Sequence, residues 1–103
     1  EVFMEAARAL ADTLIEETPN VPEERLEALF MRCLARKPDA TEFQAMMTYL
    51  QAQELLLASQ APETLIALGQ GNANSPPEAQ IERALWTLLS RAVLNLDETI
   101  TRG

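Results

Sequence analysis

Histidine is absent from this sequence of 103 residues. Histidine is the side chain that most often acts as a general acid or base near neutral pH, and it is the commonest metal ligand. Its absence excludes, within this chain, serine–histidine and cysteine–histidine nucleophilic pairs, histidine-rich zinc sites, and haem attachment through a Cys-x-x-Cys-His motif. We therefore expect no catalytic residues, no metal site and no cofactor-binding site in this chain.

Cysteine and lysine each occur once, as Cys33 and Lys37. A single cysteine excludes an internal disulfide and any multi-cysteine metal site, and Cys33 beside Phe30 and Leu34 is expected to be an inert thiol of the core. The formal net charge is −8. A surface that binds nucleic acid by releasing counterions needs many Lys and Arg side chains, so we expect no nucleic-acid partner.

The acidic residues are unevenly distributed. No Lys or Arg occurs between Lys37 and Arg83, whereas six Asp and Glu residues lie in that interval. A solvated acidic surface is the simpler interpretation, and a docking face for a basic partner is the alternative. The adjacent acids Glu16-Glu17 and Glu23-Glu24 suggest solvated or helix-capping carboxylates, because neighbours on a helix point in different directions.

Long hydrophobic runs are also absent. No run approaches the roughly 18 to 20 apolar residues of a membrane span, and no basic start followed by an apolar region suggests a signal peptide. The chain opens at Glu1-Val2-Phe3, inside a helical pattern and without an initiator methionine. We therefore expect a fragment of a larger protein.

The residues that are abundant are those of packed helices. Hydrophobic residues make up 48% of the chain, aromatic residues only 5%, and Ala and Leu are frequent. This composition predicts an all-α fold, a compact bundle of four to five helices in one domain of residues 1–103. Three or four of the helices should be long and one short.

Helix start and stop signals divide the chain into five segments. Three segments begin with Asn, Asp or Ser followed three residues later by Glu, which is the spacing of a capping box. These pairs are Asn20 with Glu23, Asp39 with Glu42, and Ser75 with Glu78. The predicted helices cover about 1–17, 21–37, 40–59, 62–69 and 76–99. Gly69 should cap the short fourth helix, and residues 69–74 should form a mobile surface loop.

The most apolar long run is 84–98, so we expect the last helix to be central. Its apolar residues form two adjacent stripes, too wide for a single packing partner. Its polar residues recur at spacings of three and four and should share one strip, formed by Thr87, Ser90, Arg91, Asn95 and Glu98. Trp86, Phe30 and Phe43 are the expected core anchors, and Met46-Met47 are expected to fill the core.

A carboxamide on a largely buried helix needs hydrogen-bond partners. We expect Asn95, together with Arg91 or Glu98, to tie the last helix to the turn 36–39. Arg36 and Glu42, which flank this turn, are the other residues expected to make structural polar contacts.

Several segments resemble one known family. They are Phe3 to Ala11, the hairpin Phe30 to Pro38 followed by Glu42, and above all Ala84-Leu85-Trp86-Thr87 through Asn95-Leu96-Asp97-Glu98. They resemble the C-terminal part of a cytochrome-c-associated domain of unknown function found in large planctomycete proteins. The chain departs from the family pattern at Ala35, a position that is often glycine. The resemblance implies a large exported, extracytoplasmic protein in which another domain holds any haem, and it implies no activity.

Two hypotheses for function follow. The first is a non-catalytic helical module that packs against other domains of its parent chain or against a protein partner. An exposed apolar patch of several hundred Å² would favour it. The second is an accessory domain of an exported redox enzyme linked to cytochrome c, or of a hydrolytic enzyme. In that case the acidic interval or the loop 69–74 would face an active site or haem in a neighbouring domain.

Overall fold

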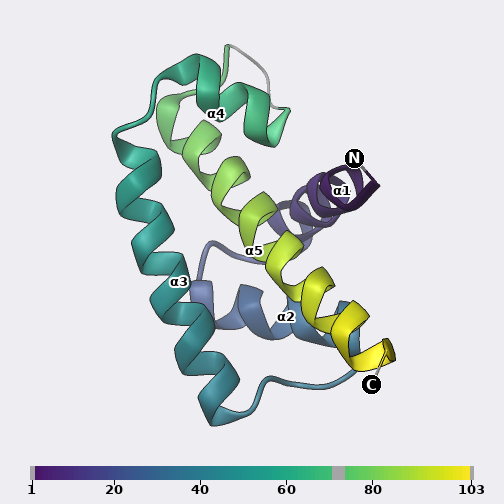
Figure 1. The fold of residues 1–103 in the computed structure, drawn as a ribbon. Helices are drawn as coiled ribbons and strands as arrows, with labels where there is room; N and C mark the ends of the chain where they lie inside the picture. Colours follow the sequence, from purple (N-terminus) through teal and green to yellow (C-terminus); the bar gives the residue numbers. More distant parts are fainter. Residues whose placement is uncertain (1, 71–73, 103) are drawn as a thin grey trace.

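The protein is a bundle of five α-helices, and the part of the chain that the structure describes contains no strand. The structure is a computed structural model that describes residues 2–70 and 74–102, with side chains for 4–70 and 74–96. The helices are α1 (Val2–Glu17), α2 (Pro22–Leu34), α3 (Ala40–Ala58), α4 (Pro62–Gly69) and α5 (Pro77–Arg102), as Figure 1 shows. The predicted all-α fold is confirmed.

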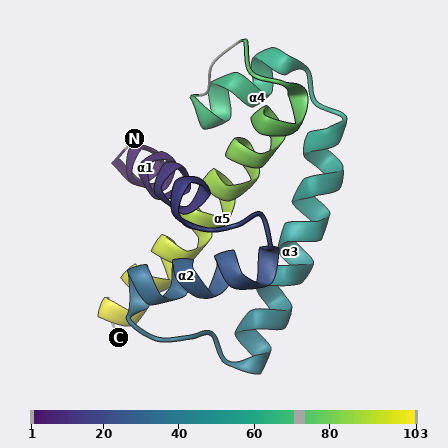
Figure 2. The same cartoon turned by 180° about the vertical axis from the view of Figure 1, so that it is seen from behind.

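Helix α5 runs through the middle of the molecule and packs against each of the other four helices (Figures 1 and 2). The four consecutive residues from Ala84 to Thr87 are all buried. Consecutive residues of a helix point about 100° apart, so α5 has packing partners on several sides at this level. The predicted central position of the last helix is confirmed.

Helix α1 lies across α5, and its buried face is made of small residues. Ala7 and Ala11 have no exposed surface, and Leu14 completes this face one turn further on. Small side chains allow two helix axes to approach closely, which suits the packing of α1 on α5.

One of the three predicted capping boxes is confirmed. The Asp39 carboxylate accepts a hydrogen bond from the Glu42 N–H at 2.7 Å, and the Glu42 carboxylate accepts one from the Asp39 N–H at 3.0 Å. The box predicted at Asn20 is wrong, because α2 begins at Pro22 with Val21 as its cap. The Val21 N–H bonds to the Pro19 carbonyl at 2.8 Å, which closes a tight turn around Asn20 before the helix begins.

The capping box predicted at Ser75 is also wrong. Helix α5 begins at Pro77, and the Pro76 carbonyl accepts the first intrahelical bond, from the Gln80 N–H at 3.1 Å. Pro76 therefore occupies the cap position, and the Ser75 backbone carbonyl instead accepts a bond from the Gln80 side chain at 3.0 Å.

Two helices end in the left-handed conformation on residues other than glycine. Helix α2 ends earlier than predicted, at Leu34, and Ala35 follows with φ 58°. The predicted cap Gly69 lies within α4, and Gln70 takes the left-handed position with φ 55°. A side chain at Gly69 would be crowded by α5, since a Cβ there would lie 3.1 Å from Arg83 Cγ and 3.2 Å from the Ala84 nitrogen. The predicted mobility of the loop 69–74 stays a prediction, and residues 71–73 of this loop lie outside the described residues.

Candidate functional site

Arg36 and Glu42 join the end of α2 to the start of α3. The two guanidinium Nη atoms donate to the two Glu42 carboxylate oxygens at 2.6 and 2.7 Å, a bidentate pair. The Arg36 guanidinium also lies 5.9 Å from the centre of the Phe30 ring. The hydrogen bond from Arg36, helped by the Asp39 backbone N–H, lowers the pKa of Glu42 from its ordinary 4.5 to about 2. The same hydrogen bond raises the pKa of Arg36.

The predicted tie of Asn95, together with Arg91 or Glu98, to this turn stays a prediction. Asn95 and Arg91 are exposed, so Asn95 is not the buried carboxamide that its apolar neighbours suggested. The hydrogen bonds of Arg36 go to Glu42 and to the Lys37 carbonyl. The Glu98 side chain lies outside the described side chains.

The polar strip predicted on α5 is divided between the core and the surface. Thr87 and Ser90 have no exposed surface, whereas Arg91 and Asn95 are exposed. The Thr87 hydroxyl donates to the Arg83 carbonyl of its own helix at 2.7 Å, which allows its burial. The strip therefore forms no continuous polar surface.

The predicted core anchors lie at different depths. Trp86 and Phe30 are 1% and 0% exposed, and Phe43 is partly buried against the same core. Met46 is buried and Met47 partly buried, and Cys33 also packs partly against this cluster.

Sequence reasoning missed the buried arginine, Arg25, which is 1% exposed. Its Nη1 donates to Glu82 at 2.8 Å, its Nε to the Thr18 hydroxyl at 2.9 Å, and its Nη2 to the Thr18 carbonyl at 3.1 Å. The guanidinium also lies 5.4 Å from the centre of the Trp86 ring. The available signal was the spacing of four residues to Leu29, which places Arg25 on the buried face of α2.

Two further arginines satisfy the carbonyl groups at the end of α4. Arg8 donates to the Leu68 carbonyl at 3.0 Å and Arg83 to the Gly69 carbonyl at 2.6 Å. Arg83 also pairs with Asp12 at 2.9 Å. Cations suit the negative end of a helix, so these contacts hold α4 against α1 and α5. They also occupy these arginines in structural contacts.

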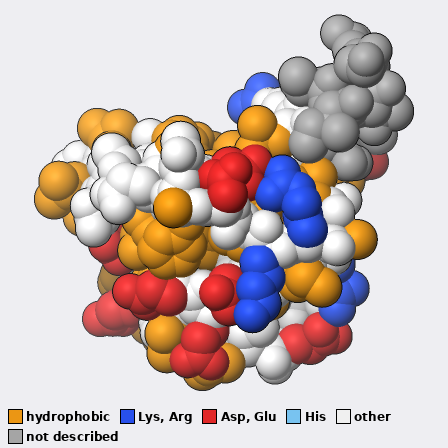
Figure 3. Space-filling model, turned by 90° about the horizontal axis from the view of Figure 1, so that it is seen from below, with side chains coloured by type: hydrophobic (Ala, Val, Ile, Leu, Met, Phe, Trp, Pro, Cys, Tyr) orange, Lys and Arg blue, Asp and Glu red, His pale blue; other side chains and the backbone are white. Residues whose placement is uncertain are grey.

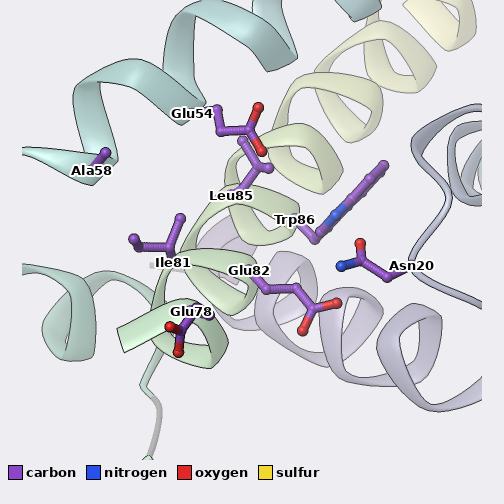
Figure 4. Close-up of a pocket in the computed structure, with 8 residues that line it drawn as sticks. All are labelled: Asn20, Glu54, Ala58, Glu78, Ile81, Glu82, Leu85 and Trp86. Atoms are coloured by element: carbon purple, nitrogen blue, oxygen red, sulfur yellow. The ribbon is translucent and has the colours of Figure 1, made fainter. Parts of the chain in front are cut away.

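A groove opens between α3 and the first half of α5, with a volume of about 300 Å³. We call it the α3–α5 groove; its lining residues are Asn20, Glu54, Ala58, Glu78, Ile81, Glu82, Leu85 and Trp86. In Figure 4, Leu85 and Ile81 lie between the carboxylates of Glu54 and Glu78, while Asn20 and Glu82 lie next to Trp86. The groove has an apolar floor and three acidic side chains, and no Lys or Arg lines it.

The other candidate surface is the outer face of α3, which we define as Thr41, Ala45, Thr48, Ala52 and Leu55. These residues are all exposed, and they recur at spacings of four, three, four and three. Leu55 is 78% exposed, and Leu56 beside it is 56% exposed. Helix α3 forms an edge of the molecule in Figures 1 and 2, and no other described helix covers its outer side.

The outer face of α3 carries no charge. Among all exposed residues of this helix only Glu54 is charged, and Glu54 lines the α3–α5 groove. A second hollow of about 340 Å³, almost wholly apolar, runs beside the face; its lining residues are Thr41, Glu42, Ala45, Met46, Tyr49, Ala92 and Leu96. By contrast, Figure 3 shows acidic and basic side chains next to one another on the face seen from below.

The described residues contain no group of three or more His, Cys, Asp or Glu side chains arranged to hold a metal ion. No helix in the described ranges is both long and apolar enough to cross a membrane. The sequence matches no family model, and no curated protein or solved structure is similar to it. The resemblance to the cytochrome-c-associated domain stays a prediction.

Proposed function

We propose that this chain is a non-catalytic helical module that packs through the outer face of α3 against a helix of its parent protein or of a protein partner. The observation that carries the proposal is an exposed helix face with apolar residues and no charge. The other long helices with described surfaces are different, because the exposed residues of α1 and α2 are mostly charged, as at Glu16, Glu17, Glu24 and Arg32.

The pattern of α3 supports a covered helix. Leu50 and Leu57 are buried against the rest of the bundle, while Leu55 and Leu56 point outward. A helix with apolar residues on both sides is typical of one that is buried on both sides. The inner side of α3 is covered by α5 and α2, so the outer side is the one that remains for a partner.

The spacing of the outer face indicates the kind of partner. Residues alternating at four and three positions form the seam through which two helices pack at a shallow angle. Ala45, Thr48 and Ala52 are small, which allows the backbone of a second helix to come close. A charged partner surface would lose its hydration against this face without gaining an ion pair. The part of the partner that contacts this face is therefore an apolar or uncharged helix surface.

If the resemblance to the cytochrome-c-associated domain reflects common ancestry, the partner helix belongs to a neighbouring domain of the same large exported protein. In that arrangement the fragment contributes to packing, and any haem is bound elsewhere in the parent.

Site-specific photo-cross-linking in cells that express the natural full-length protein tests the proposal. A photoreactive residue at Thr48 or Leu55 should give cross-links to one defined peptide segment, identified by mass spectrometry. The matched control is the same residue at Glu16 or Glu27, which are exposed on α1 and α2.

The two sets of positions should behave differently. Cross-links from Thr48 and Leu55 to one segment, with none from the control positions, would support packing through α3. Equal or absent cross-linking at all four positions would contradict it.

A further inference from the structure

We infer that the α3–α5 groove binds a basic side chain, Lys or Arg with an apolar neighbour, from a segment of the protein partner. The inference rests on the proposed function, because Glu54 and Ala58 of the groove flank Leu55 on the outer face of α3. It adds that the partner carries a basic side chain near the Leu55 end of α3.

The size of the groove limits what it can hold. At about 300 Å³ it is at the low end of the range for small-molecule pockets and suits one or two side chains. Its floor consists of Ile81, Leu85 and Trp86. Long cationic side chains bury their aliphatic stems on such apolar surface while the charged group stays at the rim.

The charges at the rim select a cation. Glu82 is already paired with the buried Arg25 at 2.8 Å. Glu54 and Glu78 are exposed, and within the described part of the chain neither forms an ion pair. Their negative charge is therefore available to an incoming ammonium or guanidinium group.

Among the described side chains, no Lys or Arg lines the groove. No Lys or Arg occurs between Lys37 and Arg83 in the sequence. Arg83 and Arg8 donate to the end of α4, and Arg36 to Glu42. The Arg25 guanidinium, which pairs with Glu82 and lies against the Trp86 ring, is buried in the core.

A divalent metal ion is the other cation that carboxylates attract, and the geometry does not favour it. Metal ions need several oxygen ligands within a few ångströms of one point. Among the described side chains no three acidic groups are arranged in this way, including those of the groove. In Figure 4, Glu54 and Glu78 lie on opposite sides of Leu85 and Ile81, which suits an elongated occupant.

A peptide titration followed by ¹H–¹⁵N NMR tests the inference on the chain of 103 residues. The probe is Ac-Ala-Leu-Lys-Arg-Leu-Ala-NH₂, and the matched probe replaces Lys and Arg by Gln. The basic peptide should shift the signals of Ile81, Leu85 and the Trp86 indole N–H. The Glu54→Gln/Glu78→Gln double variant should raise its Kd about fivefold or more, as expected for losing two partly solvated charge pairs.

The control variant is Glu5→Gln/Glu27→Gln, which removes the same net charge from exposed positions on α1 and α2. Its Kd should change less than twofold. The inference is overturned if both double variants weaken binding equally, or if the Gln peptide binds as tightly as the basic peptide. It is also overturned if neither peptide shifts the NMR signals of the groove residues.

The titration tests cation binding in the groove, and the cross-linking independently tests packing through α3. Shifts confined to Thr48, Ala52 and Leu55 would overturn the groove as a cation site and leave packing through α3 intact. If the NMR signals of the groove residues shift in a way that depends on Glu54 and Glu78, but α3 gives no cross-links, the cation site would stand and the proposed packing through α3 would be wrong.

Discussion

At the scale of single residues, Arg25 connects three parts of the bundle. It extends from α2 to the Thr18 carbonyl and hydroxyl at the end of α1 and to Glu82 on α5, beside Trp86. Burying a guanidinium is costly unless its three nitrogens find hydrogen-bond acceptors. The structure meets this requirement with three hydrogen bonds and an aromatic face, so the contact determines how α2 is oriented on the core.

Replacing Arg25 should therefore destabilise the protein much more than replacing a surface arginine. Arg25→Met keeps an unbranched stem but removes the hydrogen bonds, and should lower the free energy of unfolding by about 3 kcal/mol. Arg32→Met breaks a pair with Glu17 whose side chains are 46% and 58% exposed, and should cost less than about 1 kcal/mol. Urea denaturation of both variants measures the difference, and similar losses would contradict the structural role of Arg25.

Glu42 gives the stability a specific pH dependence. Its pKa is lowered to about 2 in the folded protein from an ordinary 4.5, chiefly by the hydrogen bond from Arg36. A depressed acid stabilises the fold fully above its unfolded pKa, and this contribution is lost as the pH falls through the folded pKa. The contribution of Glu42 should thus be constant from pH 7 to about 5 and disappear between about 4.5 and 2.

Carboxyl ¹³C NMR can follow this titration directly. The Glu42 midpoint should lie near 2 in the wild-type protein and move up towards 4.5 in Arg36→Met. A Glu42 midpoint unchanged by the substitution would show that Arg36 does not cause the shift.

At the scale of helices, the end of α2 is closed by an alanine in the left-handed conformation. The left-handed conformation at Ala35 places its N–H on the Met31 carbonyl at 3.1 Å and closes α2. This conformation brings a Cβ too close to the following carbonyl oxygen, at a cost of roughly 1 kcal/mol or more. Glycine has no Cβ and avoids the cost.

Ala35→Gly should consequently raise the free energy of unfolding by about 1 kcal/mol, because relief of strain exceeds the added entropy of the unfolded chain. Ala9→Gly, at an exposed position inside α1, should lower it by about 1 kcal/mol. Thermal unfolding of the two variants should shift in opposite directions. A loss of stability in Ala35→Gly would argue against the left-handed end of α2.

At the scale of the whole molecule, α3 has two sides with different roles. Its inner side belongs to the core around α5, whereas its outer side contributes nothing to the described bundle. Leu55 and Leu57, two positions apart and 78% and 5% exposed, lie on these two different sides within one turn. Stability should depend on one side of α3 and association on the other.

Paired alanine substitutions test this division. Leu57→Ala should cost about 2 to 4 kcal/mol because it leaves a cavity in the core. Leu55→Ala should change the stability by less than about 0.5 kcal/mol while reducing the cross-linking from Thr48 on the same face. Comparable destabilisation by the two substitutions would mean that the outer face is part of the fold.

Local patterns were sufficient for most of the fold. The stripes of Ala and Leu, the prolines at helix starts, and the pairing of Asp39 with Glu42 act within a few residues of one another, so the sequence alone predicted the helices and the confirmed capping box. The width of the apolar arc on α5 likewise predicted its central position.

Only the tertiary structure decided the roles of residues whose partners are distant in the chain. Gly69 lies where α5 approaches closely, and Arg25 is buried because it pairs with Glu82 and Thr18. Asn20 lies in a turn closed by its neighbours before α2 begins. The same holds for the candidate sites. Which residues are buried, and that Glu54 and Glu78 line the same groove, depend on how the helices cross. Helical periodicity specifies which residues share a face. It does not specify which face another helix covers.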